Sequence, residues 1–202
     1  VEQFDKGDKY FGICTVMATM PGLPMFGHGQ IEGFSEKYGM EYQRSYWDET
    51  PDPYLVDRHK REIFPLLRER TLFAGIENFY LYDFFTADGT VDENVFAYSN
   101  RLGDRRALIL YHNRYAETRG WVRASVAYAV KSQDGEKHLV QKTLVEGMGL
   151  PTGAHQFVIF RDVISDREYI RNARTLDERG LYAELQAYQV HVFSDFRVVE
   201  DT

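Results

Sequence analysis

The sequence has almost no cysteine and no long apolar run. Cys14 is the single cysteine in 202 residues, which excludes an intramolecular disulfide and a metal cage built from cysteines. No stretch approaches the ~20 apolar residues that cross a bilayer, and Val1–Asp5 does not resemble a signal peptide. These absences favour a cytoplasmic protein. The missing initiator Met is atypical of a natural N-terminus, so an export signal upstream of Val1 would go unseen.

Positive charge is also in the minority. Lys and Arg number 24 against 31 Asp and Glu, which gives a formal net charge of −7. Nucleic acids and anionic membranes are themselves negatively charged, so we expect neither as a partner. The hydrophobic share of 44% and the charged share of 27% are ordinary for a folded domain and exclude extensive disorder. No pattern calls for a cofactor.

Aromatic residues, in contrast, are abundant. Phe, Tyr and Trp together make up 15% of the chain. Such residues favour half-buried pleated surfaces, which predicts a strand-rich protein. The same rings can stack on sugars, an alternative that composition alone leaves open.

The first part of the chain alternates helix and strand. The spacing predicts a buried helix over 8–20, ended by the proline of Pro21-Gly22. A strand buried on both sides is expected over Leu23–Phe26, followed by a glycine-rich loop at Gly27–Gly33. Residues 34–50 are polar and irregular and indicate a long loop, a kind of segment that is often functional.

A second helix is predicted from Asp52-Pro53, where a capping carboxylate precedes a proline at the first helical position. Pro65 kinks or restarts this helix, and Gly75 ends it. Helix, strand, loop and helix in this order are typical of an α/β unit. One such unit cannot bury both of its faces alone, so the sequence is expected to begin in the middle of a domain.

The sequence pattern changes after Glu77, where predicted short strands follow one another at hairpin spacing. This spacing predicts an antiparallel β-sandwich, with one helical interruption from Ser165-Asp166 to about Arg179-Gly180. The predicted strands are Asn78–Phe85, Val95–Asn100, Arg106–His112, Val122–Val130, His138–Leu144, Gln156–Phe160 and Gln189–Val199. The predicted fold class is therefore mixed α and β: an incomplete α/β segment over 1–76, then an antiparallel all-β domain over 77–202.

The histidines show no metal-binding spacing. None of the six pairs with another at i, i+4, and no acidic triplet resembles a calcium loop, so no metal site is expected. Each histidine is predicted to be a surface residue or a satisfied core residue. They are His28, His59, His112, His138, His155 and His191. Cys14 lies in an apolar helix, where a thiolate is disfavoured.

Five carboxylates fall in or beside the long loop. Glycoside hydrolysis needs a pair of carboxyl groups, one held protonated and one ionised. Nothing marks any of the five as buried, and a solvated loop is the competing interpretation. They are Glu32, Glu36, Glu41, Asp48 and Glu49.

The segment Met20–Gly33 resembles part of a known family. Its Pro21-Gly22-Leu23-Pro24 portion leads into Gly29-Gln30, as a Pro-Gly-x-Pro segment leads into Gly-Gln-Glu or Gly-Asp-Glu at the eighth strand of α-amylase family glycoside hydrolases. The order of elements agrees, because in that family a helix precedes this strand, and a long loop, the last barrel helix and an antiparallel β domain follow it. Leu185–Phe193 resembles the closing strand of such a domain.

The resemblance implies a C-terminal fragment of an enzyme that acts on α-glucans. Residues 1–76 would hold the seventh helix, eighth strand and eighth helix of a (β/α)8 TIM barrel. The family's catalytic Asp, Glu and second Asp follow the fourth, fifth and seventh strands, so all three would precede Val1. This chain alone would then be non-catalytic, and its β domain would mainly stabilise the barrel. Ile31 stands where the family usually has an acidic residue, with Glu32 one position later.

The resemblance also gives candidate substrate-binding residues. Barrel enzymes place their sites at the C-terminal ends of strands, so Gly27–Gly33 would border the cleft of the intact protein. Residues expected to bind sugar hydroxyls or line the cleft wall are His28, Gln30, Glu32 and Trp47, with Tyr38 and Tyr46 as further candidates. The partner implied is an α-glucan or oligosaccharide substrate.

Two other functions remain open. A non-catalytic carbohydrate-binding module would need two or three exposed coplanar rings, for which Trp121, Tyr111, Tyr115 and Tyr128 are candidates, although strand alternation favours most of them as core residues. A self-contained interaction protein would cover the apolar surface of the incomplete α/β piece by self-association.

Overall fold

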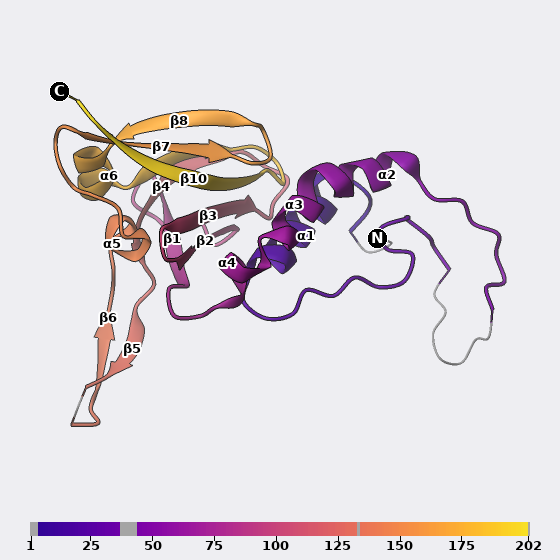
Figure 1. The fold of residues 1–202 in the computed structure, drawn as a ribbon, viewed down its shortest axis with the longest axis horizontal. Helices are drawn as coiled ribbons and strands as arrows, with labels where there is room; N and C mark the ends of the chain where they lie inside the picture. The colour runs from indigo at the N-terminus through magenta and orange to yellow at the C-terminus, as the bar shows by residue number, and fades with distance from the viewer. Residues whose placement is uncertain (1–3, 37–43, 133, 202) are drawn as a thin grey trace.

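Helices occupy the first third of the chain and strands most of the rest (Figure 1). The computed structural model describes residues 4–36, 44–132 and 134–201. The helical part consists of α1 (Asp8–Thr19), α2 (Pro53–Arg58), a π-helix η1 (His59–Ile63), α3 (Phe64–Arg68) and α4 (Arg70–Ala74). The prediction of a mixed protein dominated by antiparallel strands is confirmed.

The helix predicted over 8–20 is α1, which ends one residue earlier. Its buried side chains face the rest of the protein and include Tyr10, Phe11 and Cys14. The guanidinium of Arg70 donates hydrogen bonds to the backbone oxygens of Ala18 (2.9 Å) and Met20 (3.0 Å), which have no partner within the helix. This contact directs the chain as it leaves α1.

The second helical stretch begins where the sequence predicts it. The carboxylate of Asp52 accepts hydrogen bonds from the backbone N–H groups of Tyr54 (3.1 Å) and Leu55 (3.2 Å), and Pro53 follows as the first helical residue. Because Pro65 has no N–H to donate, the α-helical ladder is interrupted around it, and the preceding turn widens into η1.

The strand predicted over Leu23–Phe26 is absent. These residues are not part of any sheet, and the side chains of Leu23 and Met25 are 84% and 72% exposed. A strand buried on both faces needs hydrogen-bonded neighbours in a parallel sheet, and the described part of the chain supplies none beside this segment.

Eight strands form one curled antiparallel sheet in the order β8-β7-β10-β3-β2-β1-β4-β9. The expected sandwich of two facing sheets is therefore wrong in this detail: a single sheet curls over its own core. The register shifts between Tyr82 and Phe84 in β1 and between Ser194 and Arg197 in β10, and such irregularities bend a sheet. The strands are β1 (Tyr80–Thr86), β2 (Val95–Leu102), β3 (Arg105–His112), β4 (Thr118–Ser125), β7 (Gln156–Asp162), β8 (Arg167–Asn172), β9 (Leu181–Leu185) and β10 (Val190–Glu200).

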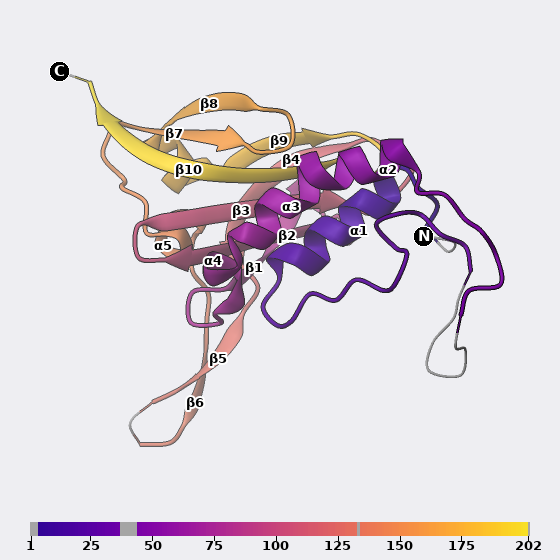
Figure 2. The ribbon, with the colours of Figure 1, turned by 45° about the vertical axis from the view of Figure 1, so that its right-hand side comes forward.

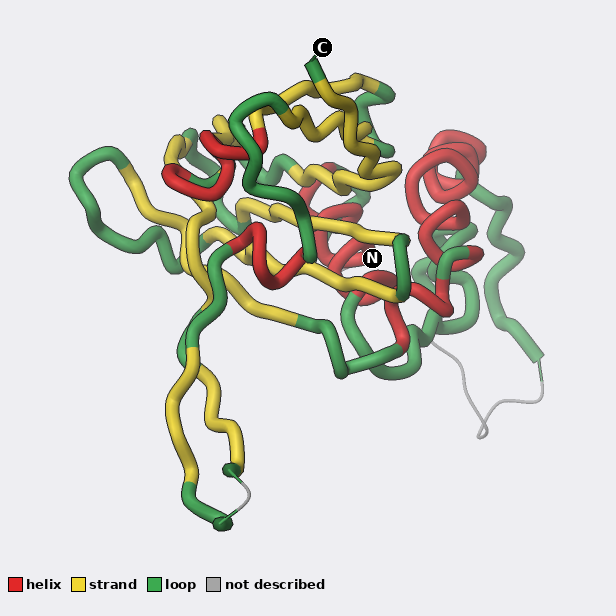
Figure 3. Tube along the Cα trace, turned by 60° about the vertical axis from the view of Figure 1, so that its left-hand side comes forward, coloured by secondary structure: helices red, strands yellow, loops and turns green. Residues whose placement is uncertain are grey.

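The remaining elements are short. Strands β5 (Tyr128–Lys131) and β6 (Lys137–Val140) form a two-stranded ribbon that projects from the body (Figures 1 and 3). Helices α5 (Leu144–Met148) and α6 (Ala173–Arg179) cap the curled sheet. The predicted helical interruption starts too early, because residues 167–172 form β8 and the helix is capped by Asn172, whose side chain accepts from the N–H of Thr175.

Two apolar cores lie on opposite faces of the sheet. Inside the curl, Phe84, Leu110 and Phe160 pack with α5 and α6. On the other face, Ile109 and Val192 pack against α1, η1, α3 and α4, which lie together across β2, β3 and β10 (Figure 2). The second core therefore includes residues from both sides of the boundary predicted at 76/77. Among the described residues, no helix has the length and apolar character to cross a membrane.

Candidate functional site

The glycine-rich segment Gly27–Gly33 forms a compact turn at the helical end of the molecule. The N–H of Gln30 donates to the backbone oxygen of Gly27 (3.1 Å), and the N–H groups of Gly33 and Phe34 both donate to that of Gly29 (2.8 Å). Gly29 and Gly33 have φ angles of +68° and +81°, which L side chains rarely adopt. The two glycines fix the shape of this turn.

Gln30 holds the turn together from within. Its side-chain oxygen accepts from the N–H of Gly27 at 2.9 Å, and its side-chain nitrogen points at the sulfur of Cys14, 4.0 Å away. The half-buried amide is therefore engaged with the turn and with α1. Gln30 lies in the predicted place, but its contacts are those of a residue that positions the loop.

Beneath this turn lies a buried polar pair that sequence reasoning did not find. The hydroxyl of Tyr10 lies 2.9 Å from Nε2 of His59 and 3.4 Å from the backbone oxygen of Gln30. Nδ1 of His59 lies 2.9 Å from the backbone oxygen of Leu55, so Nδ1 carries the proton and Nε2 accepts from Tyr10. Burial lowers the pKa of His59 and raises that of Tyr10, so both are neutral at pH 7.

His28 and Glu32 lie on the same turn. His28 is exposed and its ring lies against that of Phe34, while Glu32 is half-buried. The backbone oxygen of Glu32 accepts from the N–H of Asp52 at 2.8 Å, which ties the turn to the start of α2. His28, Gln30 and Glu32 are thus brought together on one turn, with His28 exposed and the other two half-buried.

Two carboxylates of the long loop have a structural role. Glu49 accepts from the N–H groups of Ser35 (2.7 Å) and Glu36 (3.0 Å), and Glu36 accepts from those of Tyr46 (2.7 Å) and Trp47 (3.2 Å). Hydrogen bonds from Ser35 and Glu36 hold the pKa of Glu49 below its usual value. These reciprocal contacts join the two limbs of the loop, as expected of a solvated loop more than of an acid and base pair.

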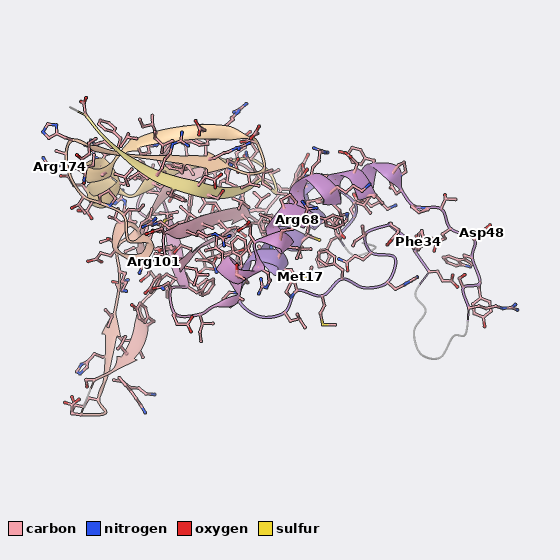
Figure 4. The ribbon with its side chains drawn as sticks, viewed as in Figure 1. Met17, Phe34, Asp48, Arg68, Arg101 and Arg174 are labelled. Atoms are coloured by element: carbon pink, nitrogen blue, oxygen red, sulfur yellow. The ribbon has the colours of Figure 1, made fainter. Side chains whose placement is uncertain are left out.

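Residues 34–36 and 44–50, the described limbs of the loop, lie at the end of the molecule away from the β domain (Figure 4). Phe34 and Asp48, one on each limb, lie at the far end of the molecule from Arg174 of α6 (Figure 4). Trp47 sits on this loop with 59% of its surface exposed, and Tyr46 is 72% exposed. Tyr38 and Glu41 lie outside the described residues. Trp47 is therefore accessible, and its backbone N–H is held by the carboxylate of Glu36 and not by the glycine turn.

Two kinds of reactive group can be checked among the described residues, a metal site and a reactive thiol. Within residues 4–36, 44–132 and 134–201, no three acidic, histidine or cysteine side chains are grouped so that they could hold a metal ion. Cys14 is buried, and burial raises the pKa of its thiol, which opposes a nucleophilic thiolate. The site can position a loop and offer exposed polar and aromatic groups to a ligand.

The histidines follow the prediction that each is a surface or satisfied core residue. One of them, His191, also forms a contact with a buried carboxylate. His59 is fully buried and hydrogen-bonded. His191 on β10 is held by the buried carboxylate of Asp162 on β7, at 2.9 Å from Nδ1. The two residues are 29 positions apart, and no sequence motif marks the pair.

These features define a class of fold: a helical segment with a glycine turn, packed on a curled antiparallel β domain, as in a part of an α-amylase. The resemblance to the α-amylase family that Met20–Gly33 predicts is confirmed at the level of the fold. No protein-family model and no curated protein matches the sequence.

Several solved structures that this chain matches are α-amylases. The α-amylase of Geobacillus thermoleovorans, solved with acarbose, superposes with a TM-score of 0.57 at 17% identity over 96% of this chain and 34% of that one. The maltogenic α-amylase AmyB of Thermotoga neapolitana superposes with a TM-score of 0.56 at 12% identity, over 93% of this chain and 36% of that one. An Anoxybacillus α-amylase superposes with a TM-score of 0.53 at 11% identity, over 96% of this chain and 33% of that one. The chain thus spans about a third of the proteins it matches, which is consistent with a C-terminal fragment.

Proposed function

We propose that this chain is the C-terminal part of an α-amylase-like glycoside hydrolase that acts on α-glucans. Residues 1–76 complete a (β/α)8 barrel with its seventh helix, eighth strand and eighth helix, and residues 77–202 form the β domain. The catalytic carboxylates of a retaining mechanism belong to the part of the protein upstream of this chain. By itself the chain is non-catalytic.

The observation that carries this proposal is the exposure of the apolar side chains of Leu23 and Met25 in the segment Leu23–Phe26. Side chains such as Leu23 and Met25 rarely stand this far into solvent beside each other in a complete fold. Seven further barrel strands would cover the segment and give it hydrogen-bonded neighbours. The glycine turn that follows would then lie at the C-terminal end of the eighth strand, where barrel enzymes keep their sites.

In this proposal the residues in and around the turn have two roles. Gln30, Tyr10 and His59 hold the loop in place from below, while His28, Glu32 and Trp47 face the cleft and contact sugar hydroxyls or rings. The β domain stabilises the barrel, because the helices that would close the barrel share an apolar core with β2, β3 and β10. A cytoplasmic location, suggested by the single cysteine, remains a prediction.

The test begins with the gene upstream of residue 1. The proposal requires ~200 or more further residues of alternating strands and helices, since a barrel has about 250. The full-length protein should hydrolyse or transfer α-glucans, and the 202-residue chain should not. A reading frame that starts near Val1 would overturn the proposal.

Site variants of the full-length protein test the roles of the turn. Gln30→Ala should lower turnover about tenfold or more, because a misplaced loop disturbs the cleft geometry. Glu32→Gln should raise KM for maltooligosaccharides while leaving the fold intact. Asp177→Asn, on the exposed face of α6, is the matched control and should leave both constants unchanged. Unchanged kinetics in the Gln30 and Glu32 variants would contradict the assignment of the turn.

A second candidate, a carbohydrate-binding β domain, is favoured by one pair of rings. Trp121 of β4 and Tyr182 of β9 lie 5.0 Å apart between centroids, and Tyr182 is 37% exposed. The other predicted rings support it less, because Tyr111 is buried and Tyr128 is half-buried, and the exposed ring of Tyr115 lies beside that of Tyr188. The planes of Trp121 and Tyr182 differ by 56°, so they form a corner and not the flat platform expected.

A further inference from the structure

The curled sheet is open along one line, between the free edges of β8 and β9. Among the described residues, each of these strands pairs on one side only, β8 with β7 and β9 with β4. A hollow of about 290 Å³ lies between them, within reach of the inner faces of β7 and β10. We call this hollow the seam pocket. Its volume is at the small end of the range of ligand pockets, about 300–1,000 Å³.

An oriented histidine lines the seam pocket. His191 is 91% buried, and its Nδ1 is fixed by the carboxylate of Asp162 at 2.9 Å. Asp162 is fully buried and also accepts from the hydroxyl of Ser165 (2.6 Å) and the N–H of Val192 (3.1 Å). Burial alone would raise the pKa of Asp162, but these hydrogen bonds outweigh it and keep the carboxylate ionised. Nε2 of His191 has no protein partner among the described residues and is the atom left for a ligand.

Donors and acceptors both surround the pocket. Arg167 and Arg171 of β8 line it, and neither has an acidic partner in the described part of the chain. Glu184 of β9 lines the opposite side and accepts from the hydroxyl of Tyr182 at 2.7 Å. Guanidinium groups only donate, carboxylates only accept, and a tyrosine hydroxyl does both.

Aromatic rings complete the surface. Tyr169 lies on the floor, stacked on Phe160 with a centroid distance of 5.6 Å. Tyr182 lines the seam pocket and also a second hollow of about 420 Å³, which Trp121 and Arg119 line on the outer face of β4. Tyr182 therefore borders both hollows, with the ring of Trp121 in one and the ring of Tyr169 in the other.

We propose that the seam pocket and the adjoining Trp121 hollow bind a neutral oligosaccharide, as a site separate from the glycine turn. Sugar hydroxyls donate and accept at once, so they match a lining in which arginine donors face a glutamate acceptor. The sugar faces match the rings of Tyr182 and Trp121. An anion would meet the carboxylate of Glu184, and an apolar ligand would leave both arginines and Glu184 without partners.

The choice of α-linked glucose units as the ligand rests on the proposed function. The experiment therefore uses the 202-residue chain, maltotriose as the probe and Trp121 as the reporter. Trp47→Phe makes Trp121 the single tryptophan, since the sequence has two. The expected result is a saturable change in Trp121 fluorescence at millimolar maltotriose, confirmed by isothermal titration calorimetry.

Variants identify the site. Tyr182→Ala should weaken binding about fivefold or more, because it removes one ring face and the contact that holds Glu184. Glu184→Gln, an exposed change that keeps the packing, should also weaken it by a few fold. Tyr54→Ala removes an exposed tyrosine from α2, far from the seam pocket, and should bind maltotriose like the parent. Circular dichroism verifies that each variant is folded.

Three outcomes would overturn the inference. They are no response up to tens of millimolar maltotriose, binding that is unchanged in both the Tyr182 and Glu184 variants, and a response to inorganic phosphate without one to maltotriose. The last would assign the arginines to an anion site. The proposed function fails separately, on the absence of a barrel upstream, so the two results can be told apart.

Discussion

The hydroxyl of Tyr10 on α1 lies 2.9 Å from Nε2 of His59 on η1, directly beneath the glycine turn. Both side chains are buried, and the contact joins two helical elements that are 49 residues apart. The same hydroxyl reaches the backbone of Gln30. The pair therefore connects the packing of the helices to the position of the loop that we assign to the cleft.

Removing the Tyr10 hydroxyl should destabilise the fold. Tyr10→Phe keeps the ring but leaves Nε2 of His59 without a donor in a buried place, which costs about 1–3 kcal/mol of the free energy of unfolding. Urea denaturation followed by circular dichroism measures it. Tyr54→Phe, at an exposed position of α2, is the control and should change stability by less than about 0.5 kcal/mol. Equal effects in both variants would contradict the role of the pair.

Stability should fall as the pH is lowered through the range in which His59 titrates in the unfolded chain. Burial lowers the pKa of His59 in the folded protein, so the unfolded state binds more protons below about pH 6.5. The free energy of unfolding then decreases as pH falls from about 6.5 towards the lowered folded pKa. Denaturation at pH 7.5 and 5.5 measures this, and His59→Gln should flatten the difference. A variant with the parent's full pH dependence would assign it to another group.

Asp162 should be among the costliest residues to truncate. Its carboxylate holds His191, Ser165 and Val192, and Asp162→Ala leaves their donors unpaired, for a loss of about 3–5 kcal/mol. Asp162→Asn keeps the size of the side chain but not its charge, so its free energy of unfolding should lie between those of the parent and of Asp162→Ala. Thermal unfolding measures both. Asp177→Ala on the exposed face of α6 should stay within about 0.5 kcal/mol of the parent, and a comparable loss there would refute the prediction.

Gly120 should not tolerate a side chain. It pairs with Thr86 in the sheet, and a Cβ at this position would lie 2.1 Å from the backbone oxygen of Phe85. The strand must move to accept it, so Gly120→Ala should cost about 2–3 kcal/mol or prevent folding. At Gly27 an added Cβ meets nothing nearer than 3.8 Å, so Gly27→Ala should have little effect. A stable, unchanged Gly120→Ala protein would show that β1 and β4 can separate at this point.

The isolated chain should self-associate through the segment Leu23–Phe26. The average mass measured by light scattering should rise above 23.6 kDa with concentration, because exposed apolar side chains of this size seek cover. Replacing Leu23 and Met25 together by serine should return the mass towards that of a monomer. Leu139→Ser tests the β5–β6 ribbon, whose Leu139 is 77% exposed. If only this change has an effect, the contact lies on the ribbon.

Local signals in the sequence predicted most elements. Asp52-Pro53 carries its helix start in the residues themselves, and Val95–Asn100 begins with β-branched and aromatic residues that favour a strand. The failures lie where distant contacts decide. Residues 167–172 pair with β7 along their whole length, and this pairing overrides the helical start suggested by Ser165-Asp166. Leu23–Phe26 has a strand's composition but no neighbour to pair with.

The candidate site could be predicted only in part for the same reason. The glycines of the turn and the positions of His28, Gln30 and Glu32 follow from neighbouring residues. The inward direction of Gln30 depends on Cys14, and the support of the turn depends on Tyr10 and His59, which meet only in the fold. Likewise, the contact between Asp162 and His191 depends on the pairing of β7 with β10.

The position of β10 has a consequence for biosynthesis. This strand lies in the middle of the sheet, between β7 and β3, although Val190–Glu200 is near the end of the sequence. Until a ribosome has released those residues, β8-β7 and the five strands from β3 to β9 are two unjoined halves with bare edges. Pairing that depends on such late residues is slow and leaves nascent chains open to proteases and aggregation. A premature stop before Val190 would therefore remove the strand that joins the halves, and the truncated product would be degraded.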